Sequence, residues 1–330
     1  MTGITTDRRI TAADIAREVG VSRTTVGFVL NATPGQTISP ATTRKVLDAA
    51  ERLGYRPHLA AQALARGRTN IVLLVLPDWP VDYSMRRHLD EASIALDQAG
   101  YSLVTMSPLP GGHARPLWES LQPDVVLGMM PFTPERYEQI RAAGIAAVIP
   151  EPNDVPTTET LANYSQGARL QVECLATLGH RRLAYAASQD PRVAELVTAR
   201  HAVAAAEAQD RGVELTEAVP VTPGSAVELT GTWHRAGITG VVAFNDDVAA
   251  LVVGAALRLG LRVPDDLAVV GHDDSPLASV FVPSITSVHV DDEGLGRYVA
   301  GLALAAATGS PPPEVQLTPR ITLVVRESSG

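Results

Sequence analysis

The chain has 330 residues, of which 45% are hydrophobic, and it carries a formal net charge of -9 at pH 7. This length exceeds one ordinary hydrophobic core and this composition is too apolar for a disordered protein, so two or three folded domains are expected. The longest apolar run near the start, residues 71–76, is too short to span a membrane, and the first ten residues lack the apolar stretch of a secretory signal. We therefore expect a cytoplasmic protein that does not contact a membrane.

Positive charge is concentrated near the N-terminus. Residues 1–68 contain ten Arg or Lys and five Asp or Glu, whereas the rest of the chain contains 17 basic and 31 acidic side chains. Clustered positive charge favours binding to phosphates through counterion release. This asymmetry predicts a DNA-binding module joined to an acidic body that does not bind nucleic acid.

Residues 11–31, TAADIAREVGVSRTTVGFVLN, predict two capped helices joined by a tight turn. Thr11 and Asp14 can cap the first helix, Gly20 ends it, and Ser22 can cap a second helix that runs to about Asn31. Such a helix-turn-helix unit places its second helix in the major groove of DNA. The pattern alone leaves a small helical hairpin open, and the local positive charge favours the DNA-binding interpretation.

The second of these helices has an apolar side and an outward side. Its apolar residues recur at helical spacing and leave four side chains outward: Arg23, Thr24, Thr25 and Phe28. Gly27 lies between them, and glycine inside a helix costs about 1 kcal/mol relative to alanine. Gly27 either allows close approach to the duplex or is simply tolerated.

A third helix is predicted to begin at Ser39-Pro40 and to end at Gly54, with an apolar stripe formed by Val46, Leu47, Ala50 and Leu53. Three helices make one small core. The alanine-rich residues 58–66 that follow are too few to hold a helix alone in water, so we expect them to order only on contact. Residues 67–70 are interpreted as the linker into the body.

From residue 71 onward, short apolar runs alternate with helical patterns. The predicted strands are residues 71–76, 102–106, 124–130 and 145–149, followed by 182–187, 213–219, 240–244 and 267–271. The predicted helices of the second set are residues 168–178, 193–209, 226–235 and 246–259. Continuous apolar strands indicate parallel sheets covered by helices on both faces. The repeated rhythm predicts two lobes with a small molecule bound in the cleft between them, beyond the carboxyl ends of the strands.

The motifs of common enzymes and metal sites do not account for this sequence. The single cysteine, Cys174, excludes an intrachain disulfide and a multi-cysteine zinc site. The acidic pairs Asp246-Asp247 and Asp273-Asp274 could suggest a metal or phosphotransfer centre, but they fit helix starts and strand ends better. GLGRYV at Gly294 has only two of the glycines of a dinucleotide fingerprint and follows no predicted strand. We expect no catalysis, no metal and no cofactor.

Several segments together resemble the lactose and purine repressor family (LacI/GalR type) of bacterial transcriptional regulators. The helix-turn-helix above, SPATTRKVLDAAERLGYRP and AAQALARGRTN are similar to that family's DNA-binding domain and hinge. GHRRLAYAAS at Gly179, FNDDVAALVVGAALRLGLRVPDDLAVVGHDDSPLA at Phe244 and LVVRESS near the end are similar to its effector-binding body. The resemblance implies an α/β protein with a three-helix DNA-binding domain, a hinge helix and a two-lobed, periplasmic-binding-protein-like (type I) effector domain.

The resemblance also implies a domain layout. The DNA-binding domain would cover residues 1–57, the hinge helix and linker 58–69, and the effector and dimerisation domain 70–330. Its first lobe would comprise about 70–162 and 288–318, and its second lobe about 163–287 and 319–330. The implied function is a DNA-binding transcriptional repressor that binds a pseudo-palindromic operator as a homodimer. A small-molecule effector, such as a sugar, would set its DNA affinity.

In the DNA-binding domain, the resemblance assigns base contacts to Arg23, Thr24 and Phe28 and phosphate contacts to Ser22 and Thr25, a division that chemistry also favours. Phe28 departs from the more usual polar residue of the family. An aromatic ring cannot donate to a guanine edge but can lie against a thymine methyl group. We therefore predict a thymine contact at that position of the operator.

In the hinge, Leu64 matches the family's leucine wedge that enters the minor groove at the operator centre, with Ala61 beside it. A contact between Leu64 and its own third helix is the alternative. His58 stands where the family more often has asparagine. This departure leaves open any cap or phosphate contact at the hinge start.

In the body, Asn245 and Asp273 match family positions that hydrogen-bond the effector, and each directly follows a predicted strand. Asn245 could also be a helix cap. Arg200 is the third expected effector ligand, with a solvated helix arginine as the alternative. Asp78, Trp79 and Tyr83 are expected at the cleft mouth.

Three features keep the effector itself unnamed. His272 replaces the family's common aromatic residue, Ala162 replaces a frequent aspartate, and residues 107–121 are irregular. A sugar-binding or transport protein and a sugar-modifying enzyme remain as alternative functions. Neither of them explains the basic N-terminal module.

Overall fold

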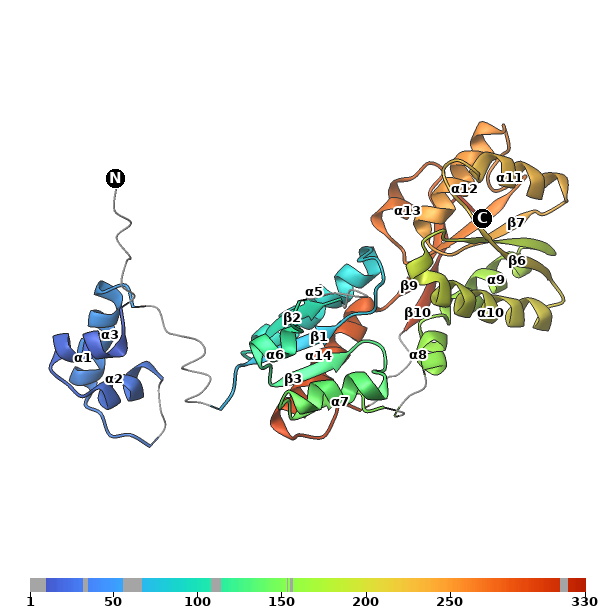
Figure 1. Ribbon diagram of the computed structural model, residues 1–330. Coiled ribbons are helices and arrows are strands. Elements are labelled where there is room, and N and C mark those ends of the chain that lie inside the picture. The colour runs from blue at the N-terminus through green and yellow to red at the C-terminus, as the bar shows by residue number, and fades with distance from the viewer. Residues whose placement is uncertain are drawn as a thin grey trace, which may run out of the picture. The chain divides into compact units, whose positions relative to one another are not determined.

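The computed structural model of the chain describes residues 10–31, 35–55, 67–107, 114–152, 154, 157–314 and 320–330. Internal contacts divide the chain into two compact units, Met1–Thr69 and Asn70–Gly330 (Figure 1). The predicted hinge residues 58–66, which include Ala61 and Leu64, lie outside the described residues.

The N-terminal unit contains three helices around one core, as predicted. They are α1 (Ala12–Val19), α2 (Arg23–Leu30) and α3 (Pro40–Arg52), and each contacts the other two. Their core is formed by Ile15, Ala16, Val26, Val46, Ala49 and Ala50. The short turn between α1 and α2 gives the predicted helix-turn-helix.

Local hydrogen bonds fix the ends of these helices. The carboxylate of Asp14 accepts from the backbone N–H of Thr11 at 2.9 Å, which closes the first turn of α1. Gly20 ends α1 with φ +75°, a left-handed conformation that glycine adopts without strain. The Ser22 hydroxyl accepts from the backbone N–H of Thr25 at 2.9 Å and caps α2.

The predicted apolar stripe of α3 was wrong at one position. Leu47 is 48% exposed, and Ala49 is fully buried in its place. The buried side of a helix recurs at steps of three and four residues, so Val46, Ala49, Ala50 and Leu53 share one face. Leu47 lies beside that face and points to solvent. Position along the helix therefore decides which side chain is buried, even though Leu47 is larger and more apolar than Ala49.

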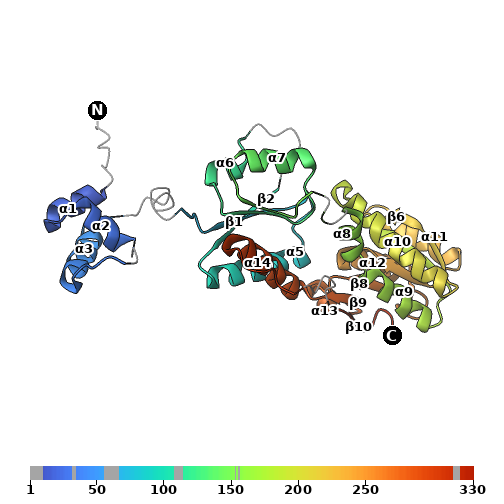
Figure 2. The same ribbon diagram turned by 90° about the horizontal axis from the view of Figure 1, so that it is seen from below.

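The first sheet of the C-terminal unit has four parallel strands in the order β2-β1-β3-β4. The strands are β1 (Ile71–Val75), β2 (Ser102–Met106), β3 (Val125–Gly128) and β4 (Ala147–Ile149). In register, Leu73 of β1 lies opposite Val104 and Val126. Figure 2 shows α6 (Leu117–Leu121) and α7 (Pro134–Ala142) on one face of this sheet and α5 (Tyr83–Gln98) and α14 (Asp292–Thr308) on the other.

The second sheet has six strands in the order β10-β9-β8-β7-β5-β6, and only β10 is antiparallel to its neighbour. The strands are β5 (Arg182–Ala187), β6 (Glu214–Pro220), β7 (Gly240–Ala243), β8 (Ala268–His272), β9 (Thr286–Val290) and β10 (Ile321–Val324). In register, Val241 of β7 lies opposite Ala184 and Val269.

Helices cover both faces of the second sheet. α9 (Gly167–Thr177) and the greater part of α10 (Ala194–Asp210) pack on one face, and α11 (Ala226–Arg235) and α12 (Asp246–Arg258) pack on the other. The short elements of this part are α8 (Thr157–Asn163), α13 (Pro276–Val280) and a 3₁₀ turn, Pro191–Val193. None of the helices in the described ranges has both the length and the apolar character needed to cross a membrane.

The eight predicted strands are all present, and the sequence missed β9 and β10. β9 has the sequence TSVHV, and its buried Thr286 and Ser287 interrupt the apolar run that marks the other strands. These hydroxyls are satisfied across the fold, since Ser287 donates to Asp246 at 2.6 Å and Thr286 donates to the carbonyl of Arg326 at 3.0 Å. Polar residues with such partners are compatible with a buried strand, but they conceal it from pattern analysis.

The missed strand also corrects the interpretation of GLGRYV at Gly294. β9 ends at Val290 and α14 begins at Asp292, so a strand does precede this segment. The two glycines nevertheless have packing roles. Gly294 donates its backbone N–H to the capping carboxylate of Asp291 at 2.8 Å, and Gly296 lies where α14 crosses α5.

Replacing Gly296 with alanine should lower the free energy of unfolding by about 1 to 3 kcal/mol, because the new methyl group would overpack the α5–α14 contact. An added Cβ would lie 2.4 Å from the carbonyl oxygen of His88 and 3.0 Å from the backbone nitrogen of Ala92. Urea denaturation measures the change. Gly254→Ala on α12 is the control, because its Cβ would meet only the flexible end of Arg258. Equal effects of the two substitutions would contradict this packing role.

Candidate ligand-binding and DNA-binding sites

The N-terminal turn of α2 presents the predicted DNA-contacting side chains. Ser22, Arg23 and Thr24 are exposed, and Thr25 and Phe28 are partly exposed. Arg23 has no hydrogen-bond or ion-pair partner among the residues that the structure describes. An exposed helix N-terminus with free N–H groups and an unpaired guanidinium is suited to phosphates and base edges.

Gly27 lies on the same helix, and packing within the unit does not require it. A Cβ built on Gly27 would have no described atom within 4 Å. The structure is therefore compatible with both explanations of Gly27, close approach to the duplex and simple tolerance. Ala61 and Leu64, the predicted hinge contacts, fall in the part of the chain that is not described.

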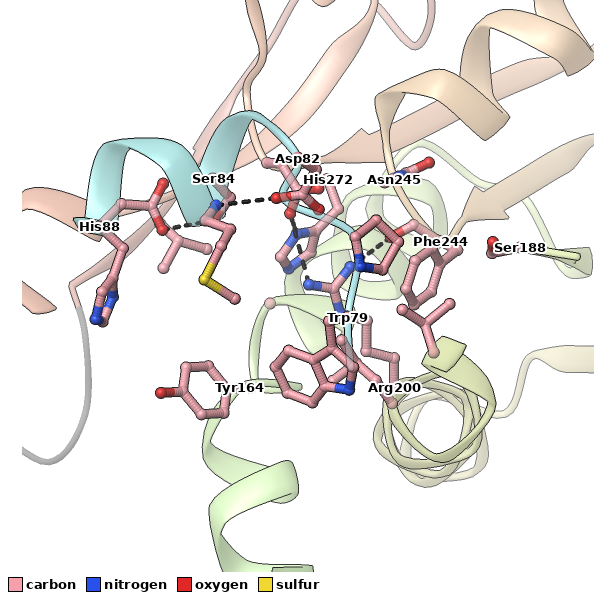
Figure 3. Close-up of a pocket in the computed structure, with 18 of the residues that line it drawn as sticks. Trp79, Asp82, Ser84, His88, Tyr164, Ser188, Arg200, Phe244, Asn245 and His272 are labelled. Atoms are coloured by element: carbon pink, nitrogen blue, oxygen red, sulfur yellow. Dashed lines mark hydrogen bonds and ion pairs between the residues drawn. The ribbon is translucent and has the colours of Figure 1, made fainter. Parts of the chain in front are cut away.

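The C-terminal unit contains a cavity of about 280 Å³. This volume is close to the lower end, about 300 Å³, of typical small-molecule sites. Residues that follow the strands β1, β5, β7 and β8 line it, together with residues of α5, α10 and α14 (Figure 3). Both sheets therefore contribute side chains to one pocket, which is where parallel α/β sheets bind ligands.

Arg200 and Asp273 form a buried ion pair in this cavity. Arg200 is 8% exposed, and its Nη2 lies 3.5 Å from Oδ1 of Asp273. The guanidinium also donates to the carbonyl of Phe244 at 2.6 Å and lies 4.7 Å from the centre of the Phe244 ring (Figure 3). The alternative of a solvated helix arginine is therefore wrong.

Asp273 is held in an unusual conformation. Its φ is +93°, a left-handed value that is strained for a residue with a Cβ. The backbone N–H of Asp273 donates to the carbonyl of Val288 at 2.8 Å, and its carboxylate lies 2.6 Å from Nδ1 of His272. Burial raises the pKa of Asp273, but Arg200 and His272 outweigh it and the net direction is downward. The carboxylate is therefore charged, and Nδ1 of His272 must be the donor.

Asn245 has the two roles that the sequence left open. Its side-chain oxygen caps α12 by accepting from the backbone N–H of Val248 at 3.0 Å, and the residue also lines the cavity. The cap occupies the oxygen, so the amide N–H groups of Asn245 remain for a ligand.

The cleft-mouth residues separate into two groups. Trp79 lines the cavity and packs edge-to-face against Tyr164, with 5.9 Å between the ring centres. Asp78 and Tyr83 are exposed and are not among the residues that line this cavity. Tyr83 instead lies under the guanidinium of Arg87.

The structure adds cavity residues that the sequence did not single out. Asp292 at the start of α14 and His88 on α5 both line the cavity, and both are buried. Asp292 follows a strand, as Asn245 and Asp273 do. The same rule would have found it if β9 had been recognised.

Three of the four aspartates that raised the question of a metal centre are bound by protein groups, and the fourth, Asp247, is exposed. Asp246 and Asp247 begin α12, and Asp273 and Asp274 follow β8. Asp274 accepts from Arg326 at 2.6 Å. Within the described ranges, His, Cys, Asp and Glu side chains nowhere gather in threes that could hold a metal ion.

Relative to the unmodified protein, Asp246→Asn should gain about 2 to 3 kcal/mol of stability as the pH rises from 5 to 8. Burial, followed by the charge of Asp273, raises the pKa of Asp246 to about 7, against about 4 in the unfolded chain. Between these values the folded state binds the extra proton, so stability falls as the pH rises from about 4 to about 7. The amide cannot ionise and avoids this loss.

Urea denaturation at several pH values measures the effect of Asp246→Asn. Asp247→Asn is the matched control, because Asp247 is exposed on the same turn of α12. A difference from the unmodified protein that does not vary with pH would show that Asp246 is already ionised at pH 5.

Comparison with known proteins identifies both parts of the chain. Residues 11–58 match the bacterial regulatory proteins of the lacI family, and residues 172–329 match the periplasmic binding protein-like domain. The HTH-type transcriptional regulator CelR of Thermobifida fusca is 31% identical over 97% of this chain and 98% of its own length. MalR of Streptomyces coelicolor is 28% identical over 96% of each chain.

Solved structures agree over the same span. The lac repressor dimer bound to operator and the anti-inducer ONPF superposes with a TM-score of 0.79 at 24% identity, covering 98% of this chain and 99% of that one. The CelR–cellobiose complex superposes with a TM-score of 0.61 at 27% identity, covering 97% of this chain and 100% of that one.

A helix-turn-helix unit followed by a two-sheet body with a ligand-sized cavity defines the class of DNA-binding transcriptional regulators with an effector domain. The level of identity to CelR, over almost the whole length of both chains, places the protein more narrowly. The chain belongs to the lacI family of bacterial regulatory proteins.

Proposed function

We propose that the protein is a cytoplasmic, homodimeric repressor whose affinity for its operator is set by a small polyhydroxylated molecule that it binds and releases unchanged. The cavity carries this proposal, because side chains from both sheets line it and the buried Arg200–Asp273 pair offers both donors and acceptors. CelR, a relative of this chain, has been solved in complex with cellobiose. That complex supports a sugar or a similar molecule as the effector.

The proposed domain layout keeps the boundaries expected from sequence: 1–57 for DNA binding, 58–69 for the hinge and 70–330 for the effector domain. Within the first, Arg23, Thr24 and Phe28 contact bases and Ser22 and Thr25 contact phosphates. Their exposure on α2 supports this division. In the hinge, Leu64 enters the minor groove beside Ala61.

The proposed effector contacts are Asn245, Asp273, Arg200 and Trp79, which the cavity brings together. Asp78 and Tyr83 are kept as contacts at the mouth only. A ligand that contacts both sheets binds more tightly to one relative placement of the sheets than to another. This difference in affinity shifts the equilibrium of a two-state protein toward the placement that binds the ligand better. Coupling of this kind typically changes the affinity for the other ligand about 5- to 150-fold.

The test begins with a library of duplexes with a randomised centre, enriched on the full-length protein. The enriched duplex and a scrambled one are then titrated by fluorescence anisotropy at physiological salt, with and without each sugar of a panel. We expect the enriched duplex to bind ~10³-fold tighter or more. Equal affinity for both duplexes would overturn the proposed function, and an enriched duplex that no bound sugar affects would overturn the allosteric part.

A further inference from the structure

The cavity carries a strong excess of negative charge. Five aspartates line it: Asp82, Asp190, Asp247, Asp273 and Asp292. Among the described residues that line the cavity, Arg200 is the single arginine and there is no lysine. Two histidines also line the cavity, but burial lowers the pKa of His88 to about 4 and lowers that of His272 as well. Neither imidazole offsets the carboxylates at neutral pH.

Two of the five carboxylates have a cationic partner. Asp273 is paired with Arg200 at 3.5 Å, and Asp190 is paired with Arg192 at 2.6 Å. The other three, Asp82, Asp247 and Asp292, have no ion pair with any described residue. A cavity with three carboxylates outside any ion pair repels anionic ligands and attracts cations.

Asp292 is the most informative of the three. It is 2% exposed; one carboxylate oxygen accepts from the Ser84 hydroxyl at 2.6 Å, and the other, Oδ2, has no described partner. A buried acceptor without a partner costs a folded protein free energy. Burial, followed by the charges of Asp273 and Asp82, raises the pKa of Asp292 to about 7, although the Ser84 hydroxyl and the charge of Arg87 act in the opposite direction. A cation beside Oδ2 would satisfy this oxygen and favour its charged form.

The remaining walls suit a ring rather than a simple ion. Trp79 and Tyr164 present aromatic surface to the cavity from one side (Figure 3). Aromatic faces attract cations and also pack against the C–H face of a sugar ring. The amide of Asn245 and the Arg200–Asp273 pair supply donors and acceptors for hydroxyl groups.

We propose that the effector is a hydroxylated amine of about monosaccharide to disaccharide size, such as an amino sugar, whose ammonium group binds against Asp292. This inference rests on the proposed function in taking the cavity as the effector site. It excludes uronic acids and sugar phosphates as effectors, because their charge would meet the unpaired carboxylates. Asp82 and Asp247 add to the attraction, and the aromatic wall holds the ring.

The test compares sugars that differ mainly in charge. Full-length protein is titrated by calorimetry at pH 7.5 with three amines: glucosamine, galactosamine and the β-1,4-linked glucosamine disaccharide. Each amine is compared with its parent sugar, which has a hydroxyl group in place of the amine (glucose and cellobiose among them), and with its N-acetyl form. Glucuronate is the anionic comparison. We expect at least one amine to bind at least 10-fold more tightly than its hydroxyl parent and than its N-acetyl form. Glucuronate should not bind.

Asp292→Asn should reduce the affinity for that amine 10-fold or more, to about the affinity of the neutral parent. Asp265→Asn, which alters an exposed carboxylate paired with Arg262, is the control and should leave the affinity for the amine unchanged. If Asp292→Asn does not fold, salt dependence on the unmodified protein replaces it, because only the amine should lose affinity as ionic strength rises.

The outcomes separate this inference from the proposed function. If every amine binds no better than its parent, or if none binds, the charge inference is wrong, whereas a neutral sugar that alters operator affinity would still support the proposed function. If an amine binds tightly and operator affinity does not respond, the charge inference stands and the allosteric part of the proposed function fails.

Discussion

Replacing Arg200 with methionine should lower the free energy of unfolding at pH 7 by about 3 to 5 kcal/mol and abolish the response of operator affinity to the effector. Removing one partner of a buried ion pair leaves the other charge uncompensated, at about this cost. Asp273 is 6% exposed and would lose its only arginine partner among the described residues, and the carbonyl of Phe244 would lose a donor at 2.6 Å. Urea denaturation gives the stability, and anisotropy with operator DNA gives the response.

Two further variants make this result specific. Arg262→Met is the control, since Arg262 forms two ion pairs but its side chain is 69% exposed, and exposed pairs contribute about 0 to 1 kcal/mol. Adding Asp273→Asn to Arg200→Met removes the uncompensated charge, so much of the lost stability should return while the effector response stays absent. A single Arg200→Met variant as stable as Arg262→Met would show that the buried pair contributes little.

The fold followed from apolar patterning because most strands of the two sheets are buried on both faces. β3, β7 and β8 are buried at every position, so their apolar runs are continuous in the sequence. β9 was missed because its buried hydroxyls are paired with Asp246 and with the C-terminal segment, which lies about 40 residues further along the chain. A pattern of single residues cannot show that a polar side chain has a distant partner.

The residues of the cavity were predicted only in part. The residues that the sequence missed depend on contacts with distant parts of the chain. Asn245 and Asp273 were found because polar residues directly after parallel strands point toward the cleft. Asp292 obeys this rule but follows the strand that was missed. Arg200 depended on the register of a helix, and its burial by Phe244 and Asp273 could not be derived from the local sequence. His88 has no sequence signal, since only the crossing of α5 and α14 brings it to the cavity.

Replacing Arg23 with alanine should weaken binding to the enriched operator by about 2 to 6 kcal/mol, or roughly 30-fold to 10⁴-fold, and should affect scrambled DNA far less. A side chain that contacts a base edge contributes about 1 to 3 kcal/mol of discrimination, and a dimer makes the contact once in each half-site. Arg23 is exposed at the first position of α2 and has no partner among the described residues that would compete with DNA. Fluorescence anisotropy with both duplexes measures the two affinities.

Arg52→Ala removes the same charge from the same unit and is the matched control. Arg52 lies on α3 and pairs with Glu18 on α1, so its loss should weaken operator and scrambled DNA by a similar small factor. A second enrichment with the Arg23→Ala protein separates the roles further, because a base contact predicts relaxed preference at one position in each half-site while the rest of the operator is unchanged. Equal weakening of both duplexes with unchanged base preference would instead assign Arg23 to phosphate, and the sequence specificity of α2 would then depend on Thr24 and Phe28.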